Sequence, residues 1–299
     1  MKTLSILIKR NTKMFFKDKG MFFTSLITPA ILLVLYATFL FNVYKDSFTA
    51  NIPAGLTLAD SFANALAGGQ LVSSLLSVSC VTVPFCANFL MVQDKANGSI
   101  KDIRISPIKP SVLSVSYYFA TLISSLIICL VALCLGLIYL GALGWYLSVA
   151  DVLLLIFDVI LLVFFGTALS SVINFFLNTQ GQISAVGTVI SAGYGFICGA
   201  YMPISSFGEG LQKILMFLPG TYATSMLRNH ALNGVLGSME SDNYPLEFIN
   251  SLKDTLDCNL YFFGTKVPVY AMLTFLAASV IALAGVYILL NSAKKSAKN

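Results

Sequence analysis

Six long apolar runs constrain the fold of this chain more than any other feature of its sequence. The hydrocarbon core of a bilayer is about 30 Å thick, so a spanning helix needs roughly 20 mostly apolar residues. The runs match that length, and the sequence therefore predicts an all-α membrane protein with six transmembrane helices. We expect them at residues 21–41, 69–92, 112–140, 152–177, 183–201 and 267–290, within one transmembrane domain of residues 21–299.

The composition agrees with a membrane protein. Only 10% of the residues are charged and 57% are hydrophobic, whereas a soluble domain carries about 25% charged residues. Six spans use most of the 299 residues, which leaves no room for a second large domain. We therefore expect a function in transport across or within the bilayer.

The cations gather beside alternate ends of the predicted spans. They precede the first span, separate the second from the third, and follow the last. The positive-inside bias then predicts a multi-pass protein of the cell membrane with both termini in the cytoplasm, and an even number of spans gives the same result. These cations are Lys2, Lys9, Arg10, Lys13, Lys17 and Lys19, then Lys95, Lys101, Arg104 and Lys109, then Lys294, Lys295 and Lys298.

Residues 1–20 are predicted to form an interfacial helix ahead of the first span. At a helical period, its apolar and basic side chains fall on opposite sides. Such a helix lies along a membrane surface with its cations toward anionic head groups. The alternative is an ordinary basic flank that only sets orientation. The apolar arc contains Leu4, Leu7, Ile8, Met14 and Phe15, and the basic arc contains Lys2, Lys9, Arg10, Lys13 and Lys17.

Residues 93–111 form the longest predicted cytoplasmic loop, and the only one dense in charge. We expect a short helix here with Ile100, Ile103 and Ile105 along one apolar edge. Pro107 and Pro110 would end it before the third span, because proline disrupts a helix interior.

The predicted extracellular segment 202–266 is the largest piece outside the spans. Ser206 followed by Glu209 resembles a capping box and predicts a helix start. The two proline positions at 203 and 219 bracket a piece too short to span. We interpret it as a re-entrant or interfacial helix pair supported by protein neighbours. Its motif residues are Pro219, Tyr222 and Arg228, with Arg228 expected as an anchor that extends toward the membrane surface.

Sequence motifs for catalysis are missing from this chain. No stretch fits the phosphate-binding pattern G-x-x-x-x-G-K-[ST], nor H-E-x-x-H or G-x-S-x-G. His230 is the single histidine, which excludes a histidine-rich metal site and a triad. We therefore expect a transport protein and no enzyme, with no cofactor bound by this chain.

Four residues within the predicted spans are candidates for the translocation path or for helix packing. Asp158 is the one ionisable residue well inside a span, where a carboxylate is costly and often functional; a hydrated or hydrogen-bonded structural carboxylate is the alternative. Gly195 and Gly199 form a small-xxx-small pair, suited to intramolecular packing or to a dimer seam. Pro84 interrupts the second span.

Two stretches resemble the permease subunits of type-2 ABC exporters, which move drugs, polysaccharides or lipids. The segment 217–234, FLPGTYATSMLRNHALNG, is similar to the LP…Y…LR…G segment of that family. The stretch from Asp94 to Pro107 resembles its acidic-x-x-x-Gly-[ST]…[ST]-Pro pattern. The order of elements matches over essentially the whole chain, and Asp94 stands where the family usually has Glu.

The resemblance implies a mechanism. Two permease subunits, identical or homologous, would assemble with two copies of a separate ABC-type ATPase that binds ATP and Mg. The N-terminal helix would be a connecting helix on membrane lipid, and spans two and five would line the route. No nucleic acid is expected as a partner. The charged loop would contact the ATPase through Asp94, Lys95, Gly98, Lys101 and Arg104.

Several functions fit these features. The leading hypothesis is an exporter that moves an amphiphilic drug-like, peptide or lipid-linked substrate outward by alternating access. A polysaccharide or glycolipid exporter of the same family is the nearest alternative. A secondary carrier not coupled to ATP would need a charge network or inverted repeats, and a membrane scaffold would use segment 202–266 to hold a partner.

Overall fold

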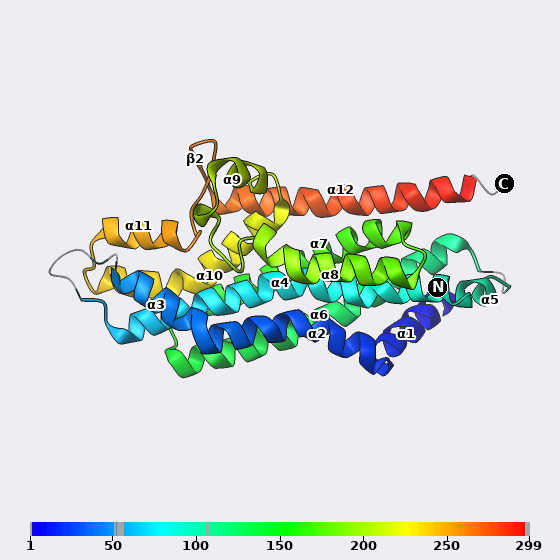
Figure 1. Cartoon of the computed structure of the whole chain (residues 1–299), viewed down its shortest axis with the longest axis horizontal. Coiled ribbons are helices and arrows are strands. Elements are labelled where there is room, and N and C mark those ends of the chain that lie inside the picture. Colours follow the sequence, from blue (N-terminus) through cyan, green and yellow to red (C-terminus); the bar gives the residue numbers. More distant parts are fainter. Residues whose placement is uncertain (1, 51, 53–56, 106–107, 297–299) are drawn as a thin grey trace.

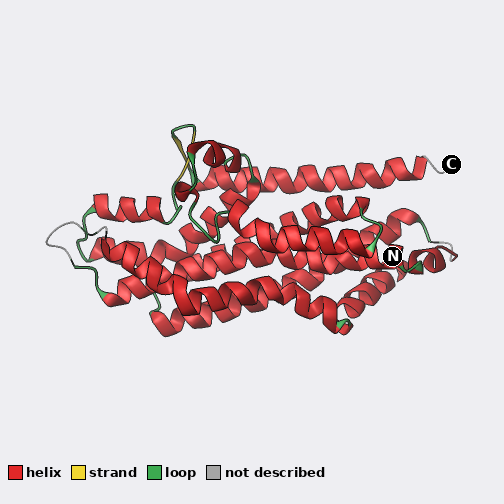
Figure 2. Cartoon of the chain, viewed as in Figure 1, coloured by secondary structure: helices red, strands yellow, loops and turns green. Residues whose placement is uncertain are grey.

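The computed structural model describes residues 2–50, 52, 57–105 and 108–296, and helices dominate this part of the chain (Figure 2). Its strands are β1 (Leu260–Phe262) and β2 (Thr265–Val267), an antiparallel hairpin. The helices are α1 (Lys2–Lys17), α2 (Lys19–Leu35), the π-helical η1 (Tyr36–Leu40), α3 (Phe41–Ala50), α4 (Asp60–Ala96), α5 (Ser99–Ile105), α6 (Pro110–Leu143), α7 (Val149–Phe176), α8 (Gln180–Ile197), the 3₁₀ turn η2 (Ile204–Ser206), α9 (Glu209–Leu215), α10 (Pro219–Ser241), α11 (Leu246–Thr255) and α12 (Val269–Ser296).

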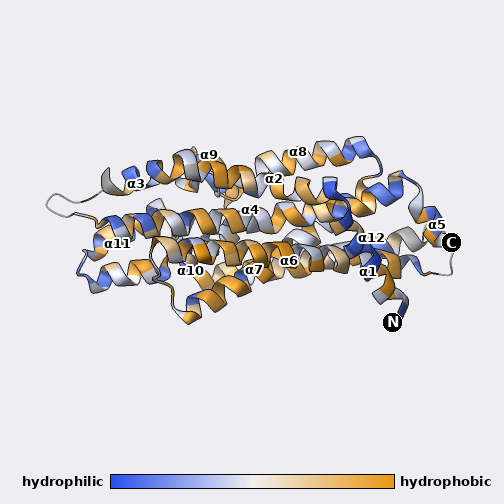
Figure 3. Ribbon diagram, turned by 90° about the horizontal axis from the view of Figure 1, so that it is seen from below, coloured by the Kyte–Doolittle hydropathy of each residue, from blue (hydrophilic) through white to orange (hydrophobic). Residues whose placement is uncertain are grey.

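The long helices lie side by side along one axis of the molecule (Figure 1). One end carries α1, α5 and the last turns of α12, and we call it the basic end. The opposite end, which carries α3 and α11, is the far end. Hydrophobic residues line the middle of the long helices, while hydrophilic residues gather toward both ends (Figure 3). This distribution is typical of a bundle that crosses a bilayer.

Five helices among the described residues are long and apolar enough to cross a membrane. They are the stretch Lys19–Asp46, α4, α6, α7 and the stretch Val269–Ala293 of α12. The predicted class of all-α membrane protein is therefore confirmed. The helices extend beyond the predicted spans. Between the first two of them lie α3 and the first turns of α4, where Phe62 and Leu66 are buried with Leu236 and Phe248.

The fifth predicted span, residues 183–201, corresponds to α8 and is not one of these five. Its 18 residues give a length of about 27 Å at 1.5 Å per residue. Two glutamines and several glycines also lower its hydropathy. The helix ends at Ile197, before the predicted boundary. Six spans therefore stay a prediction.

Helix α4 is the central element of the bundle, and its most apolar stretch is completely buried by other parts of the chain. It contacts α2, α6, α7, α8 and α10. Glycines let the neighbours approach closely. A Cβ on Gly166 of α7 would lie 2.4 Å from the carbonyl oxygen of Cys80, and one on Gly136 of α6 would lie 2.8 Å from a methyl of Val72. Small residues at helix contacts are the main means of close packing in membranes.

We expect Gly166→Ala to destabilise the bundle by about 1–3 kcal/mol, the usual cost of overpacking. The added Cβ would meet backbone atoms of α4, which cannot rotate away as a side chain can. The matched control is Gly193→Ala on α8, where a Cβ meets nothing within 4 Å and alanine favours the helix. Thermal unfolding in detergent measures both, and equal midpoints for Gly166→Ala and wild type would contradict the close contact.

The predicted N-terminal helix is confirmed as α1, but its faces differ from the simple two-arc picture. Leu7 and Phe15 are buried and Lys9 and Lys13 are exposed, as expected. Asn11 is also buried, because its amide donates to the Ser116 hydroxyl of α6 at 3.3 Å. Met14, assigned to the apolar arc, is 41% exposed. Much of the apolar face thus packs on protein, and the membrane-surface position stays a prediction.

The segment 202–266 contains more helix than the re-entrant pair that the sequence suggests. Helix α9 has seven residues and begins after Gly208 with no side-chain cap, so the predicted capping box from Ser206 does not form. Helix α10 runs for 23 residues beside α4 toward the far end. A short helix, α11, follows Pro245. Entry of α9 and α10 into the bilayer stays a prediction.

Candidate functional site: the charged loop and the buried ion pairs

The charged loop forms the predicted short helix, α5. Gly98 turns the chain out of α4 with φ of +80°, a conformation that suits glycine. Ile100 and Ile103 pack against the core cluster, whereas Ile105 is 86% exposed and does not share their apolar edge. Lys101 is exposed. The side chain of Arg104 and residues 106–107, which include Pro107, lie outside the described residues.

Asp94 is buried just ahead of this loop and is bonded within the chain. Its Oδ2 lies 2.5 Å from Nη1 of Arg10 and accepts the hydroxyl of Tyr117 at 2.5 Å. Sequence reasoning directed Arg10 toward lipid head groups and Asp94 toward an ATPase. The structure pairs the two side chains, which joins α1, α4 and α6, and their contacts with lipid or an ATPase stay predictions.

Lys95 anchors the same end of α4 to α7. Its ammonium donates to the carbonyl oxygens of Asn174, Phe175 and Leu177 at 3.0, 2.9 and 2.9 Å. Carbonyls at a helix C-terminus have no partner in the helix and attract a cation. Lys95, another predicted ATPase contact, therefore caps α7. Asp94 and Lys95 are adjacent, so a displacement of α5 would act on α1, α6 and α7 together.

Asp158 of α7 pairs with His230 of α10, with its Oδ2 2.5 Å from the Nδ1 of the imidazole. The carboxylate is 2% exposed and the imidazole 14%. Two turns toward the far end, the amide of Asn233 donates to Asp151 at 2.8 Å. Sequence reasoning missed both pairs, although positions 151 and 158 share one face of a helix, as do 230 and 233.

Arg228 is buried and bonded, at 1% exposure, which corrects its interpretation as an anchor that extends toward the membrane surface. Its guanidinium lies 3.0 Å from Oδ2 of Asp257 and donates to the carbonyl of Gly199 at 2.5 Å. The same carboxylate oxygen accepts the backbone N–H of Ile204 at 2.7 Å. Burial raises the pKa of the Asp257 carboxyl, and the Arg228 guanidinium opposes that rise. No sequence pattern indicated Asp257.

The remaining candidates hold local structure. Pro84 lies inside α4 without ending it. Gly195 faces the ring of Tyr201, where a Cβ would lie within 2.6 Å of three ring carbons, and Gly199 follows the end of α8 with φ of +76°. They therefore do not form a pair on one helix face.

The re-entrant motif residues join α10 to its surroundings. Pro219 opens α10 at its first turn, a position that needs no N–H donor. The hydroxyl of Tyr222 donates to the carbonyl of Met216 at 2.5 Å, and its ring meets Phe275 of α12 edge-on at 5.2 Å. No group of three or more His, Cys, Asp or Glu side chains in the described part of the chain could hold a metal ion.

In the described part of the chain, four long apolar helices surround a fifth, the buried α4, and a charged helical loop lies at one end; this arrangement defines a multi-pass helical membrane protein. The sequence profile of the ABC-2 type transporters matches residues 2–231. That match covers well over half of the chain, so the protein belongs to the ABC-2 type transporter family, whose members are the permease components of ABC transporters. No curated protein matches the chain significantly.

Proposed function

We propose that this chain is the permease subunit of an ATP-driven exporter and changes between inward- and outward-open states as a separate ATPase binds and hydrolyses ATP. The observation that carries the proposal is the double anchoring of the end of α4 that leads into α5. Asp94 ties this end to α1 and α6, and Lys95 ties it to α7. A partner that pushes on α5 therefore moves three helices besides α4.

The exposed part of α5 is the proposed docking surface. Lys101 and Ile105 leave the body of the protein at the basic end, and Arg104 belongs to the same helix. Membership of the family implies an ABC-type ATPase as partner. Two ATPase copies with bound ATP and Mg, together with a second permease, would complete the complex. The basic end would face the cytoplasm of a cell membrane, as the cation bias favours.

The cargo is proposed to be an amphiphilic compound moved outward. Of the two helices that the resemblance assigns to the route, α4 is covered by its own chain, while α8 exposes most of its length. Exposed residues of α8 include Val189 at 68% and Phe196 at 49%. Exposed apolar side chains of this kind suit a drug-like, peptide or lipid-linked substrate, so we assign α8 to the route.

We expect Ile105→Asp and Lys101→Glu each to weaken ATPase docking about tenfold or more, because an interface residue of this kind contributes over 1 kcal/mol. The measurement is permease-stimulated ATP hydrolysis, as a function of ATPase concentration, in vesicles that contain both proteins. The control is Lys266→Glu on the exposed β2 strand, away from the basic end, which should leave the stimulation unchanged.

Two results would overturn the proposal. One is wild-type stimulation by both α5 variants at every ATPase concentration. The other is substrate export by the permease alone, with no ATPase present, which would favour a secondary carrier. Normal thermal unfolding of the variants establishes that a loss of stimulation is not a loss of fold.

A further inference from the structure

The tip of the β1–β2 hairpin holds a phenylalanine in an unfavourable backbone conformation. Phe263 and Gly264 form the two-residue loop with φ of +47° and +84°, the pattern of a type I′ turn. Such turns prefer Asn-Gly, because a bulky side chain at positive φ is strained. Phe263 is nevertheless 66% exposed. A strained aromatic residue that faces outward suggests a role outside the core.

Phe263 belongs to an apolar surface at the start of α12, which we call the aromatic ledge. Its ring meets Phe262 at 4.8 Å and Phe217 at 6.3 Å, centre to centre. The two exposed rings of the ledge are Phe217, at 58% exposure, and Phe263, at 66%.

The aromatic ledge is continuous with the membrane-facing surface of α12. Helix α12 begins two residues after β2. Only 11% of the most apolar stretch of this helix is buried by the rest of the chain. In Figure 1 the hairpin and α9 flank the first turns of α12, opposite to the basic end. The exposed face of a spanning helix contacts lipid, so a surface that joins its end lies at the edge of the same bilayer. Aromatic side chains concentrate at that boundary.

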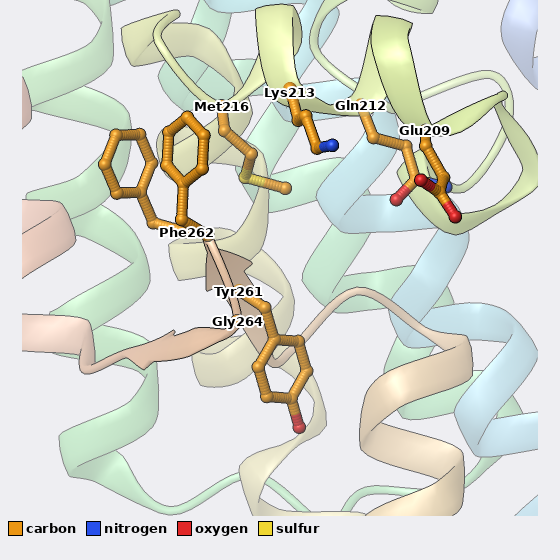
Figure 4. A pocket seen from close by; sticks show the side chains of 8 residues that line it. Glu209, Gln212, Lys213, Met216, Tyr261, Phe262 and Gly264 are labelled. Atoms are coloured by element: carbon orange, nitrogen blue, oxygen red, sulfur yellow. The ribbon is translucent and has the colours of Figure 1, made fainter.

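A small cleft opens between α9 and the hairpin beside the ledge (Figure 4). Its volume is about 200 Å³, below the roughly 300–1,000 Å³ of pockets for drug-sized ligands. Glu209 and Lys213, one turn apart on α9, supply opposite charges. Tyr261 and Phe263 supply aromatic rings, and Met216 an apolar surface. The cleft thus offers one group for an anion, one for a cation, and apolar walls between them.

We propose that this cleft binds the head group of phosphatidylethanolamine in the leaflet opposite the basic end, with the aromatic ledge seated in that leaflet. The Lys213 ammonium pairs with the lipid phosphate. The Glu209 carboxylate and the aromatic faces receive the lipid ammonium. Met216 contacts the carbons between these groups. An anionic lipid without an ammonium would leave Glu209 unpaired beside a phosphate, so the charge pattern favours a zwitterionic lipid that retains N–H donors.

Insertion of the ledge is tested with a single tryptophan. Trp145 is the only tryptophan of the chain. Trp145→Phe therefore removes all tryptophan fluorescence, and Phe263→Trp in this variant places one fluorescent probe at position 263. In vesicles of lipids brominated near the head group, we expect emission of the residue-263 probe to be quenched at least threefold more than that of Leu246→Trp. Leu246 on α11 is similarly exposed, at 60%, but lies at the far end. Equal quenching of the two probes would overturn insertion.

Head-group selectivity is tested on full-length protein in detergent, by thermal shift against short-chain phosphatidylethanolamine and phosphatidylglycerol. We expect at least tenfold tighter binding of the ethanolamine lipid, and loss of this preference in Glu209→Gln and Lys213→Glu. Phe263→Asn should keep or raise the unfolding midpoint, because Asn-Gly suits the turn, yet weaken lipid binding at least fivefold. Equal affinities of wild type for the two lipids, or unchanged binding by Phe263→Asn, would overturn the proposal.

Discussion

Arg228→Met is expected to destabilise the protein by about 3–5 kcal/mol, the usual cost of removing one partner from a buried ion pair. The change leaves Asp257 as an uncompensated carboxylate at 4% exposure. It also removes a donor from the carbonyl of Gly199, so the end of α8 and the segment after α11 lose their shared contact. The thermal midpoint of the purified protein in detergent measures the loss.

A double variant separates the ion pair from the shape of the site. Arg228→Met with Asp257→Asn removes both charges but keeps an oxygen that can accept the N–H of Ile204. We expect it to recover most of the lost stability, because neutral replacement of both partners is far less costly. Lys266→Met, on an exposed strand, should change stability by less than about 0.5 kcal/mol. A wild-type midpoint for Arg228→Met alone would contradict the buried pair.

The second large effect is expected at the α7–α10 contact. Among the described residues, His230 is the only side chain that hydrogen-bonds to Asp158, through Oδ2 of the carboxylate. The other oxygen, Oδ1, is buried with no hydrogen-bond partner in this part of the chain. His230→Phe therefore leaves the carboxylate without a side-chain partner. A buried carboxylate left alone should cost about 3–5 kcal/mol. The matched control is Asn233→Ala at the same α7–α10 contact. This change removes one hydrogen bond to Asp151, but Asp151 keeps its bonds to Ser148. That control should cost about 1 kcal/mol.

Transport by Asp158→Asn decides between a structural and a proton-carrying carboxylate. The asparagine oxygen can still accept from His230, and the neutral side chain cannot release a proton. We expect ATP-driven transport to continue with an unchanged pH profile, because one carboxylate–imidazole pair does not form a relay through the bundle. Loss of transport in a normally folded Asp158→Asn protein would instead favour a secondary carrier.

Local patterns in the sequence were sufficient for much of the fold. Helical periodicity predicted α1, and the charged loop with its flanking prolines predicted α5. Five of the predicted spans coincide with long apolar helices. These features depend on residues close together in the chain, so composition and spacing report them directly. The fifth predicted span, α8, is not among these helices, because its glycines and glutamines lower its hydropathy.

The candidate site was predicted less well, for a reason visible in its contacts. Asp94, Lys95, Arg10 and Arg228 were correctly singled out as unusual charged residues, yet each was assigned an external partner. In the structure each bonds to the chain itself. Their partners lie 84, 79 and 29 positions away, and no local pattern specifies which of several distant groups will be near.

The sequence by itself determined that this protein is a bundle of apolar helices with a basic end and a charged loop, and it indicated the ABC-2 type transporter family. Hydropathy and charge bias are sums over neighbouring residues, and they hold whatever the helices later contact. Only the tertiary structure decided that Asp94 meets Arg10, Asp158 meets His230 and Arg228 meets Asp257. Such pairs depend on the rotation and axial offset of packed helices, which are set by close contacts such as that of Gly166 against α4.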